Sequence, residues 1–209
     1  MAMGMDITVW VVEWAHLMRL APDRRLQVLQ ETVDGAEDAS SGTVGAGWLW
    51  PLGPGRCWLG RYEFDGTLGS YTPHFRAANA WDAVRGAVPP VPRAAVDDFL
   101  AGLIWWGPDP AEDADHIDDG VFPSLDALWR SGPVIVRAPD TVAGLAAAWQ
   151  QAQPLLSQLR GPYREAHAAL TDSGHPAADF DSFVRLLAQW AEVLGEARRR
   201  DWGVIGLPM

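Results

Sequence analysis

The sequence predicts an α+β fold: a mixed β-sheet that includes a β-hairpin and is covered mainly by C-terminal helices. The almost continuous apolar run from Ile7 to Val12 is typical of a central strand covered on both faces. The dipeptide Asp65-Gly66, between two strand-like runs, favours a tight hairpin turn. The widest helical apolar stripe lies over residues 179–200. Strands and helices do not alternate strictly, which argues against a doubly wound parallel sheet.

The first half of the chain is predicted to be mainly β-structure. A helix that begins near Pro22 and ends at Gly35 follows the first strand. Residues 34–47 are small and polar, so we expect a mobile surface loop there. Residues 48–76 are then expected to form strands, beginning with a short strand over residues 48–50.

The predicted hairpin fixes which side chains face each other. With the Asp-Gly pair as a two-residue loop, Gly60 opposes Tyr71 and Tyr62 opposes Gly69. An aromatic ring would then cover each glycine, which stabilises positions that are otherwise weak in a strand.

The second half is predicted to be mainly helical. Pro92, Gly107 and Pro108 mark the two ends of a helix over residues 92–106. Capping residues, apolar periodicity and a break at Pro154 give the remaining elements. These are a strand over residues 133–136, a helix over 140–152 with a continuation over 155–159, a helix over 179–200 and a last strand over 203–207. No linker divides the chain, so a single domain over residues 1–209 is expected.

Composition excludes several classes of function. All 16 basic residues are Arg, which excludes lysine Schiff bases and phosphate-binding loops that need Lys. A net charge of −11 argues against partners such as nucleic acid or an anionic membrane. Cys57 is the single cysteine, so no internal disulfide forms, and we interpret it as a buried thiol. No signal peptide or membrane span is recognised, and we expect a cytoplasmic protein.

An acidic segment over residues 109–120 is the one stretch with several potential metal ligands. An EF-hand beginning at Asp115 fails because Ile117 takes a ligand position. We therefore favour a solvated, mobile loop over a divalent-ion site, and we expect neither a metal nor a cofactor.

Charged and ring side chains are most closely spaced along the predicted hairpin and in the residues that follow it. A guanidinium, a carboxylate and an imidazole close together can bind an anionic ligand or transfer a proton. The alternative is that these charges only solubilise an exposed sheet face. The candidate ligand-binding residues are Arg61, Glu63, Tyr71, His74 and Arg76.

Twelve tryptophans are far more than a chain of this length ordinarily has. Most must lie in the core because each indole buries a large apolar area. We nevertheless expect some indole surface to be exposed or to line a groove, where aromatic side chains favour partners or flat ligands.

Several short motifs, most of them in the second half of the chain, form a familiar pattern. They are Gly132-Pro133, Ala138-Pro139-Asp140-Thr141-Val142, Leu159-Arg160 before Tyr163, Phe183–Ala197 running into Trp202-Gly203-Val204-Ile205, and the opening Met3-Gly4-Met5. With these motifs, the second half of the chain resembles the YfbM-like family of bacterial proteins, and the whole chain looks like a group of actinomycete proteins without assigned activity. The resemblance implies a fold and a cytoplasmic location, but no functional residue, because that family has no catalytic residues to align.

Two functions remain open from the sequence. The first is a non-enzymatic binding or interaction protein, of a regulatory or immunity type, whose acidic surface attracts a basic protein partner. The second is a small-molecule enzyme or ligand-binding protein with an Arg/Glu/His pocket near the hairpin, walled by tryptophan. We favour the first.

Overall fold

A five-stranded antiparallel sheet organises the chain, in the order β2-β3-β1-β5-β4. Its strands are β1 (Ile7–Val12), β2 (Trp48–Leu49), β3 (Leu59–Tyr62), β4 (Ile135–Arg137) and β5 (Gly203–Pro208). The computed structural model describes residues 7–39, 47–50, 57–67, 70–105, 107, 121–122, 135–172 and 178–208. The last strand therefore lies beside the first, which brings the two ends of the described chain together.

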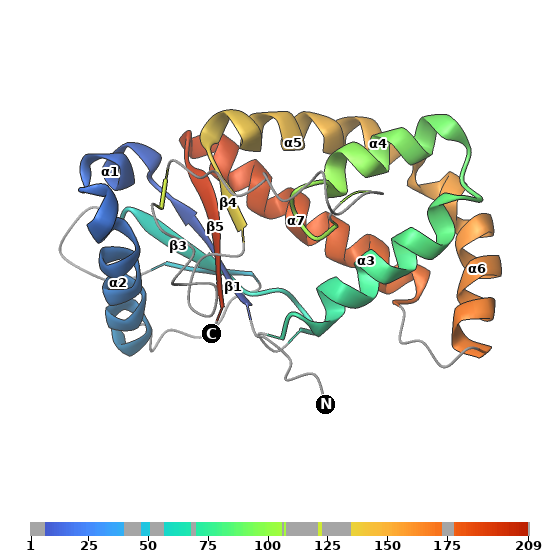
Figure 1. The fold of residues 1–209 in the computed structure, drawn as a ribbon, viewed down its shortest axis with the longest axis horizontal. Helices are drawn as coiled ribbons and strands as arrows, with labels where there is room; N and C mark the ends of the chain where they lie inside the picture. Colours follow the sequence, from blue (N-terminus) through green and yellow to red (C-terminus); the bar gives the residue numbers. More distant parts are fainter. Residues whose placement is uncertain are drawn as a thin grey trace.

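Helices cover both faces of the sheet (Figure 1). Residues in β1 are all buried and alternate between the faces, as the sequence predicts for a central strand. Val9 and Val11 face the larger core, formed with the C-terminal helices. Trp10 and Val12 face the smaller core, where α1 (Trp14–Arg19) and α2 (Arg25–Ala39) pack.

The larger layer is helical and extends well beyond the sheet (Figure 1). Its central element is α7, whose C-terminal part packs on β1 and β5 and whose N-terminal part packs on α3 and α6. Asp179 caps α7 by accepting a hydrogen bond from the backbone N–H of Ser182 at 2.9 Å. The elements of this layer are α3 (Thr72–Arg85), α4 (Pro90–Leu100), α5 (Pro139–Ala152), the 3-10 helix η4 (Gln153–Leu159), α6 (Arg160–Asp172) and α7 (Phe180–Arg200).

The predicted α+β class with covering C-terminal helices is confirmed, and the sheet is antiparallel in each of its four described pairings. A hairpin is also present, but it is formed by the consecutive strands β2 and β3. The predicted hairpin after Asp65-Gly66 is wrong. β3 already has β1 on one side and β2 on the other, so no edge is left for a following strand.

The turn itself does form, with a different conformation and a different exit. The backbone N–H of Thr67 donates to the carbonyl of Phe64 at 3.3 Å, and Gly66 has φ of 75°. Asp65 is not among the described residues with positive φ, so the turn is not the predicted type I′. Tyr71 then begins α3 as its N-cap instead of pairing with Gly60.

Helix boundaries differ from prediction in the first half of the chain. The helix expected to end at Gly35 continues to Ala39, so residues 34–39 are not loop. The helix predicted over 92–106 runs from Pro90 to Leu100, and the chain then turns through Gly102, which has φ of 75°. The predicted loop residues 40–46 and 109–120 lie outside the described part. α3 and α6 are absent from the sequence prediction.

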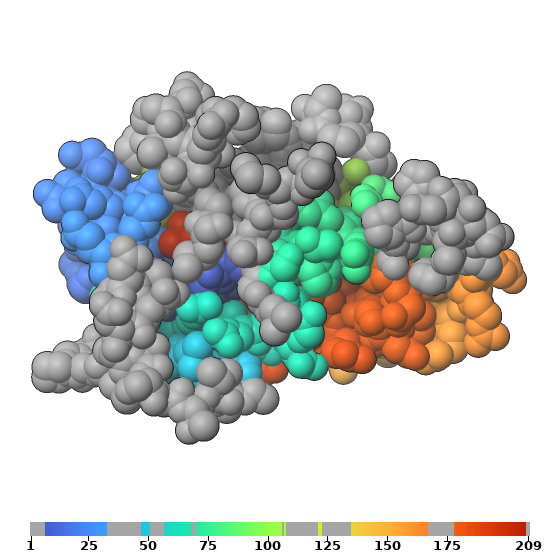
Figure 2. Space-filling view, turned by 90° about the horizontal axis from the view of Figure 1, so that it is seen from below, coloured from blue at the N-terminus to red at the C-terminus, as the bar shows by residue number. Residues whose placement is uncertain are grey.

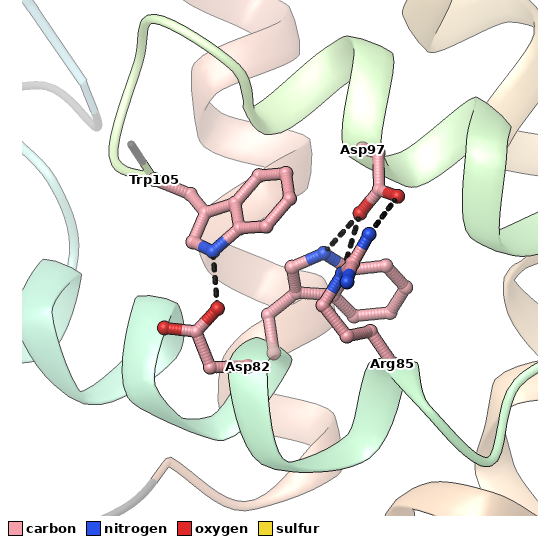
Figure 3. A network of polar contacts seen from close by, with 5 residues as sticks. Asp82, Arg85, Asp97 and Trp105 are labelled. Atoms are coloured by element: carbon pink, nitrogen blue, oxygen red, sulfur yellow. Dashed lines mark hydrogen bonds and ion pairs between the residues drawn. The ribbon is translucent and has the colours of Figure 1, made fainter. Parts of the chain in front are cut away.

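A polar network joins α3 to α4 (Figure 3). Asp97 on α4 accepts hydrogen bonds from the indole of Trp81 at 2.8 Å and from Arg85 at 2.7 and 3.2 Å. The indole of Trp105 donates to Asp82, and the Arg85 guanidinium lies 5.0 Å from the centre of the Trp105 ring. The Asp97 carboxylate raises the pKa of Arg85 by accepting these bonds. The indoles, carboxylates and guanidinium of this cluster bind one another, so we assign it a structural role.

Candidate functional site

Two of the five predicted site residues share a cleft. Arg61 and Glu63 form an ion pair at 3.2 Å, with side chains 21% and 38% exposed. They line a cleft of about 660 Å³ between the turn at residues 64–67 and the Gln189–Glu192 stretch of α7. Their common face is as predicted, because alternate residues of an extended chain point the same way.

Arg76 lies in an adjoining cleft. It is exposed on α3 and lines a smaller hollow of about 230 Å³ with Ser182 and Arg185 of α7. Figure 2 shows the green-teal surface of α3 bordering the orange-red surface of α7, and residues of α7 line both hollows. The 64–67 turn separates them, so the predicted charges are spread over two clefts rather than gathered in one.

Tyr71 and His74 lie in the core and reach neither cleft. His74 is 1% exposed, and its ring stacks on Tyr71 with centroids 4.9 Å apart. Phe64 and Trp190 meet the imidazole edge-on at 4.9 and 5.9 Å. Residues 71–76 begin a helix rather than a strand, and the 3.6-residue period turns His74 inward together with Ala78.

The environment of His74 makes it a neutral group. Burial lowers the pKa of His74 to about 3 and raises the pKa of Tyr71 to about 12. Neither ring nitrogen of His74 has a hydrogen-bond partner within the described residues. The imidazole is therefore uncharged near neutral pH and is out of reach of a ligand in either cleft.

A larger groove lies between β2, α5 and α7. Its volume is about 920 Å³. Partly exposed indoles of Trp48 and Trp50 line one side, and Trp149 lines it from α5. We call this the Trp–Arg groove; its other lining residues are Ala146, Gln150, Ala191, Glu192, Gly195, Glu196, Arg198, Arg199 and Arg200.

The lining of the groove includes small residues on two adjacent helices. Ala146 comes from α5, and Ala191 and Gly195 lie one turn apart on α7. A Cβ built on Gly195 meets no heavy atom within 4 Å, so the space above this glycine is open. Larger side chains here would fill the groove.

The tryptophan side of the groove is held in place by ring packing. Trp48 and Trp50 stack with centroids 5.3 Å apart and planes 17° apart. The Arg200 guanidinium lies 4.2 Å from the centre of the Trp50 ring and 5.0 Å from that of Trp202. Such cation–π contacts restrict both partners, so the wall is preorganised.

Both carboxylates in the groove are already engaged. Glu192 accepts hydrogen bonds from the Trp48 indole at 3.1 Å and from the Tyr62 hydroxyl at 2.9 Å. Burial, and then the hydrogen bond to Glu192, raise the pKa of Tyr62. Glu196 is 6% exposed and pairs with Arg199 and Arg200.

The sequence contains one signal of this site, the excess of tryptophan. It does not reveal the location, because Trp48 and Trp149 are about a hundred residues apart and line one groove only because β2 and α5 both lie against α7. Arg198–Arg200 are explained equally well as the cationic end of a helix.

Two other features of the described residues bear on function. They contain no group of three or more His, Cys, Asp or Glu side chains arranged to hold a metal ion. The acidic segment 109–120 lies outside them, so the prediction of no divalent-ion site there stays a prediction. None of the described helices is long and apolar enough to cross a membrane.

The chain matches no family model, no curated protein and no solved structure. The resemblance to the YfbM-like family stays a prediction.

Proposed function

We propose that this protein acts by non-covalent binding, and that the Trp–Arg groove holds a ligand. The observation that carries the proposal is the set of partly exposed indoles, Trp48, Trp50 and Trp149, lining one groove from β2 and α5. Exposed tryptophan is costly unless something covers it, and aromatic anchors contribute much of the energy at binding surfaces.

The dimensions and rigidity of the groove support this. About 920 Å³ is within the range of roughly 300–1,000 Å³ found for ligand sites. Stacked rings and paired charges fix Trp50 and Arg200 before anything binds, which reduces the entropy lost on binding.

A regulatory or immunity-type role in the cytoplasm remains part of the proposal. The net charge of −11 supports it, because an acidic surface attracts basic protein partners and raises their association rate. The groove itself carries more cationic than anionic side chains, so such a partner would meet the protein elsewhere on its surface.

The alternative is a small-molecule enzyme or ligand-binding protein that uses the clefts beside the 64–67 turn. Its support is weaker, because His74 is enclosed by rings and neutral and so does not supply an acid or base there. These clefts can still bind an anion, because arginines line them: Arg61, Arg76 and Arg185.

Filling the groove tests the proposal. Gly195→Trp places an indole in open space, and Gly144→Trp, at an exposed glycine of α5 outside the groove, is the matched control. Each immobilised protein is exposed to an extract of the cells that make it, and retained proteins and metabolites are compared by mass spectrometry. We expect a species held by wild type and by Gly144→Trp to be lost from Gly195→Trp. Equal retention by all three proteins, or none by wild type, contradicts the proposal.

A further inference from the structure

We propose that the ligand of the Trp–Arg groove is a planar organic anion: an aromatic ring system that carries one carboxylate, sulfonate or phosphate group. This inference rests on the proposed binding function and adds the chemical class. Two independent features of the groove carry it, the indole walls and the charge balance of the lining.

The indole walls select for flat rings. Trp48 and Trp50 present a stacked pair from the sheet, and Trp149 comes from the helix layer. Rings placed against indoles gain contact area and favourable offset or edge-to-face geometry beyond simple burial. The small side chains of Ala191 and Gly195 leave depth for such a ring.

The charge balance selects for an anion. The groove is lined by three arginines and two glutamates, although the whole chain has a net charge of −11. Glu196 is occupied by Arg199 and Arg200, and Glu192 by the Trp48 indole and the Tyr62 hydroxyl. The lining therefore has one more positive than negative side chain, and both carboxylates already accept hydrogen bonds within the protein.

Arg198 is the group that we assign to the anion. It is exposed and lines the groove, and its guanidinium has no hydrogen-bond or ion-pair partner within the described residues. Its neighbours Arg199 and Arg200 are held by Glu196. A guanidinium donates two parallel hydrogen bonds to a carboxylate, sulfonate or phosphate, which fixes the orientation of the bound ring.

Isothermal titration calorimetry with a matched set of probes tests the class. Naphthalene-2-sulfonate is the planar anion, 2-naphthylmethylammonium is the planar cation, and cyclohexanesulfonate is the non-planar anion. We expect naphthalene-2-sulfonate to bind wild type at least tenfold more tightly than either of the others. Comparable binding of the cation overturns the charge assignment, and comparable binding of cyclohexanesulfonate overturns the planarity assignment.

Variants locate the probe. Arg198→Gln should weaken naphthalene-2-sulfonate binding about tenfold or more, because it removes the charged donor of the hydrogen bonds to the sulfonate. Arg24→Gln, an exposed arginine on the other side of the sheet, should leave the affinity unchanged. Gly195→Trp should abolish binding and Gly144→Trp should not. Undiminished binding to Gly195→Trp or to Arg198→Gln overturns the inference.

The two proposals fail in different ways. If extract capture depends on an unfilled groove but naphthalene-2-sulfonate does not bind wild type at millimolar concentration, the groove is a binding site and the assigned chemical class is wrong. If the probe binds in the groove but no natural species is captured, the chemical class stands and the proposed function is contradicted.

Discussion

The indole of Trp50 lies directly against the backbone of Gly60, in the space that a Cβ at this position would occupy. A second ring does the same nearby: the Tyr62 ring lies 2.7 Å from the Cβ position of Gly47, which has φ of 90°. Glycine is therefore required at both positions by close ring packing, and Trp50 can take its place in the groove wall because Gly60 of β3 has no side chain.

Gly60→Ala should displace Trp50 and destabilise the protein. Added methyl groups in well-packed sites cost roughly 1–3 kcal/mol, and we expect that loss in the free energy of unfolding from urea titration. Gly86→Ala is the matched control, because Gly86 has a helical backbone and open space around it. The control should be neutral or slightly stabilising. Equal stability of Gly60→Ala and wild type contradicts this packing.

The sequence correctly predicted that aromatic rings pack over glycines, but the ring that it predicted over Gly60 is wrong. The expected pairs, Tyr71 over Gly60 and Tyr62 over Gly69, came from a local turn signal; Gly69 lies outside the described residues, so the second pair stays a prediction. The actual partner of Gly60 is Trp50, from the strand before β3 rather than after it. Local chemistry specified the turn at Asp65-Gly66, but strand order, which is a property of the whole sheet, decided the path of the chain after that turn.

Elements with strong periodicity and clear ends were predicted well. The strand from Ile7 to Val12, the helix after Asp179 and the break of α5 at Pro154 lie where expected. α3 was missed because a segment beginning Tyr71-Thr72-Pro73 comes after an apparent hairpin. Assigning a strand period of 2 in place of 3.6 also placed His74 at the surface, whereas it is buried.

Asp97 should be the most sensitive position in the network that joins α3 and α4. Asp97→Ala removes the acceptor for the buried Trp81 indole and both bonds from Arg85. Leaving a buried donor unpartnered costs about 1–3 kcal/mol, which should lower the free energy of unfolding by that amount. The neighbouring Asp98 provides the control, and Asp98→Ala should change stability by less than about 0.5 kcal/mol. Similar effects of the two variants contradict the assignment.

Gly195 gives a direct test of open space in the groove, with Gly144, outside the groove, as its control. Gly195 on α7 and Gly144 on α5 both have no heavy atom within 4 Å of a built Cβ. Replacing either by Ala should raise the free energy of unfolding by about 0.5–1 kcal/mol, because Ala has the higher helix propensity and restricts the unfolded chain. Thermal and urea unfolding measure both. A loss of stability in Gly195→Ala alone means that the groove is closed over that residue.

His74 should make the protein sensitive to acid. Its pKa is about 3 in the folded chain against an ordinary value of 6.5, so between these pH values the unfolded chain binds one proton more than the folded chain. The stability associated with the neutral imidazole is complete above pH 6.5 and is lost as the pH falls towards 3. The slope reaches about 1.4 kcal/mol per pH unit, so about 2 kcal/mol is lost by about pH 5.

His74→Phe removes that dependence and keeps a ring against Tyr71, Phe64 and Trp190. Phenylalanine has no polar atoms to bury, so the variant should be at least as stable as wild type at about pH 7.5, with an advantage that grows by about 2 kcal/mol on going to about pH 5. Urea titrations at both pH values give the difference directly. Two results would contradict this: stability curves of the two proteins that run parallel with pH, or an NMR titration of the His74 ring with a midpoint near the ordinary value of 6.5. Either result would mean that the imidazole is solvated and that His74 is not enclosed by the ring cluster.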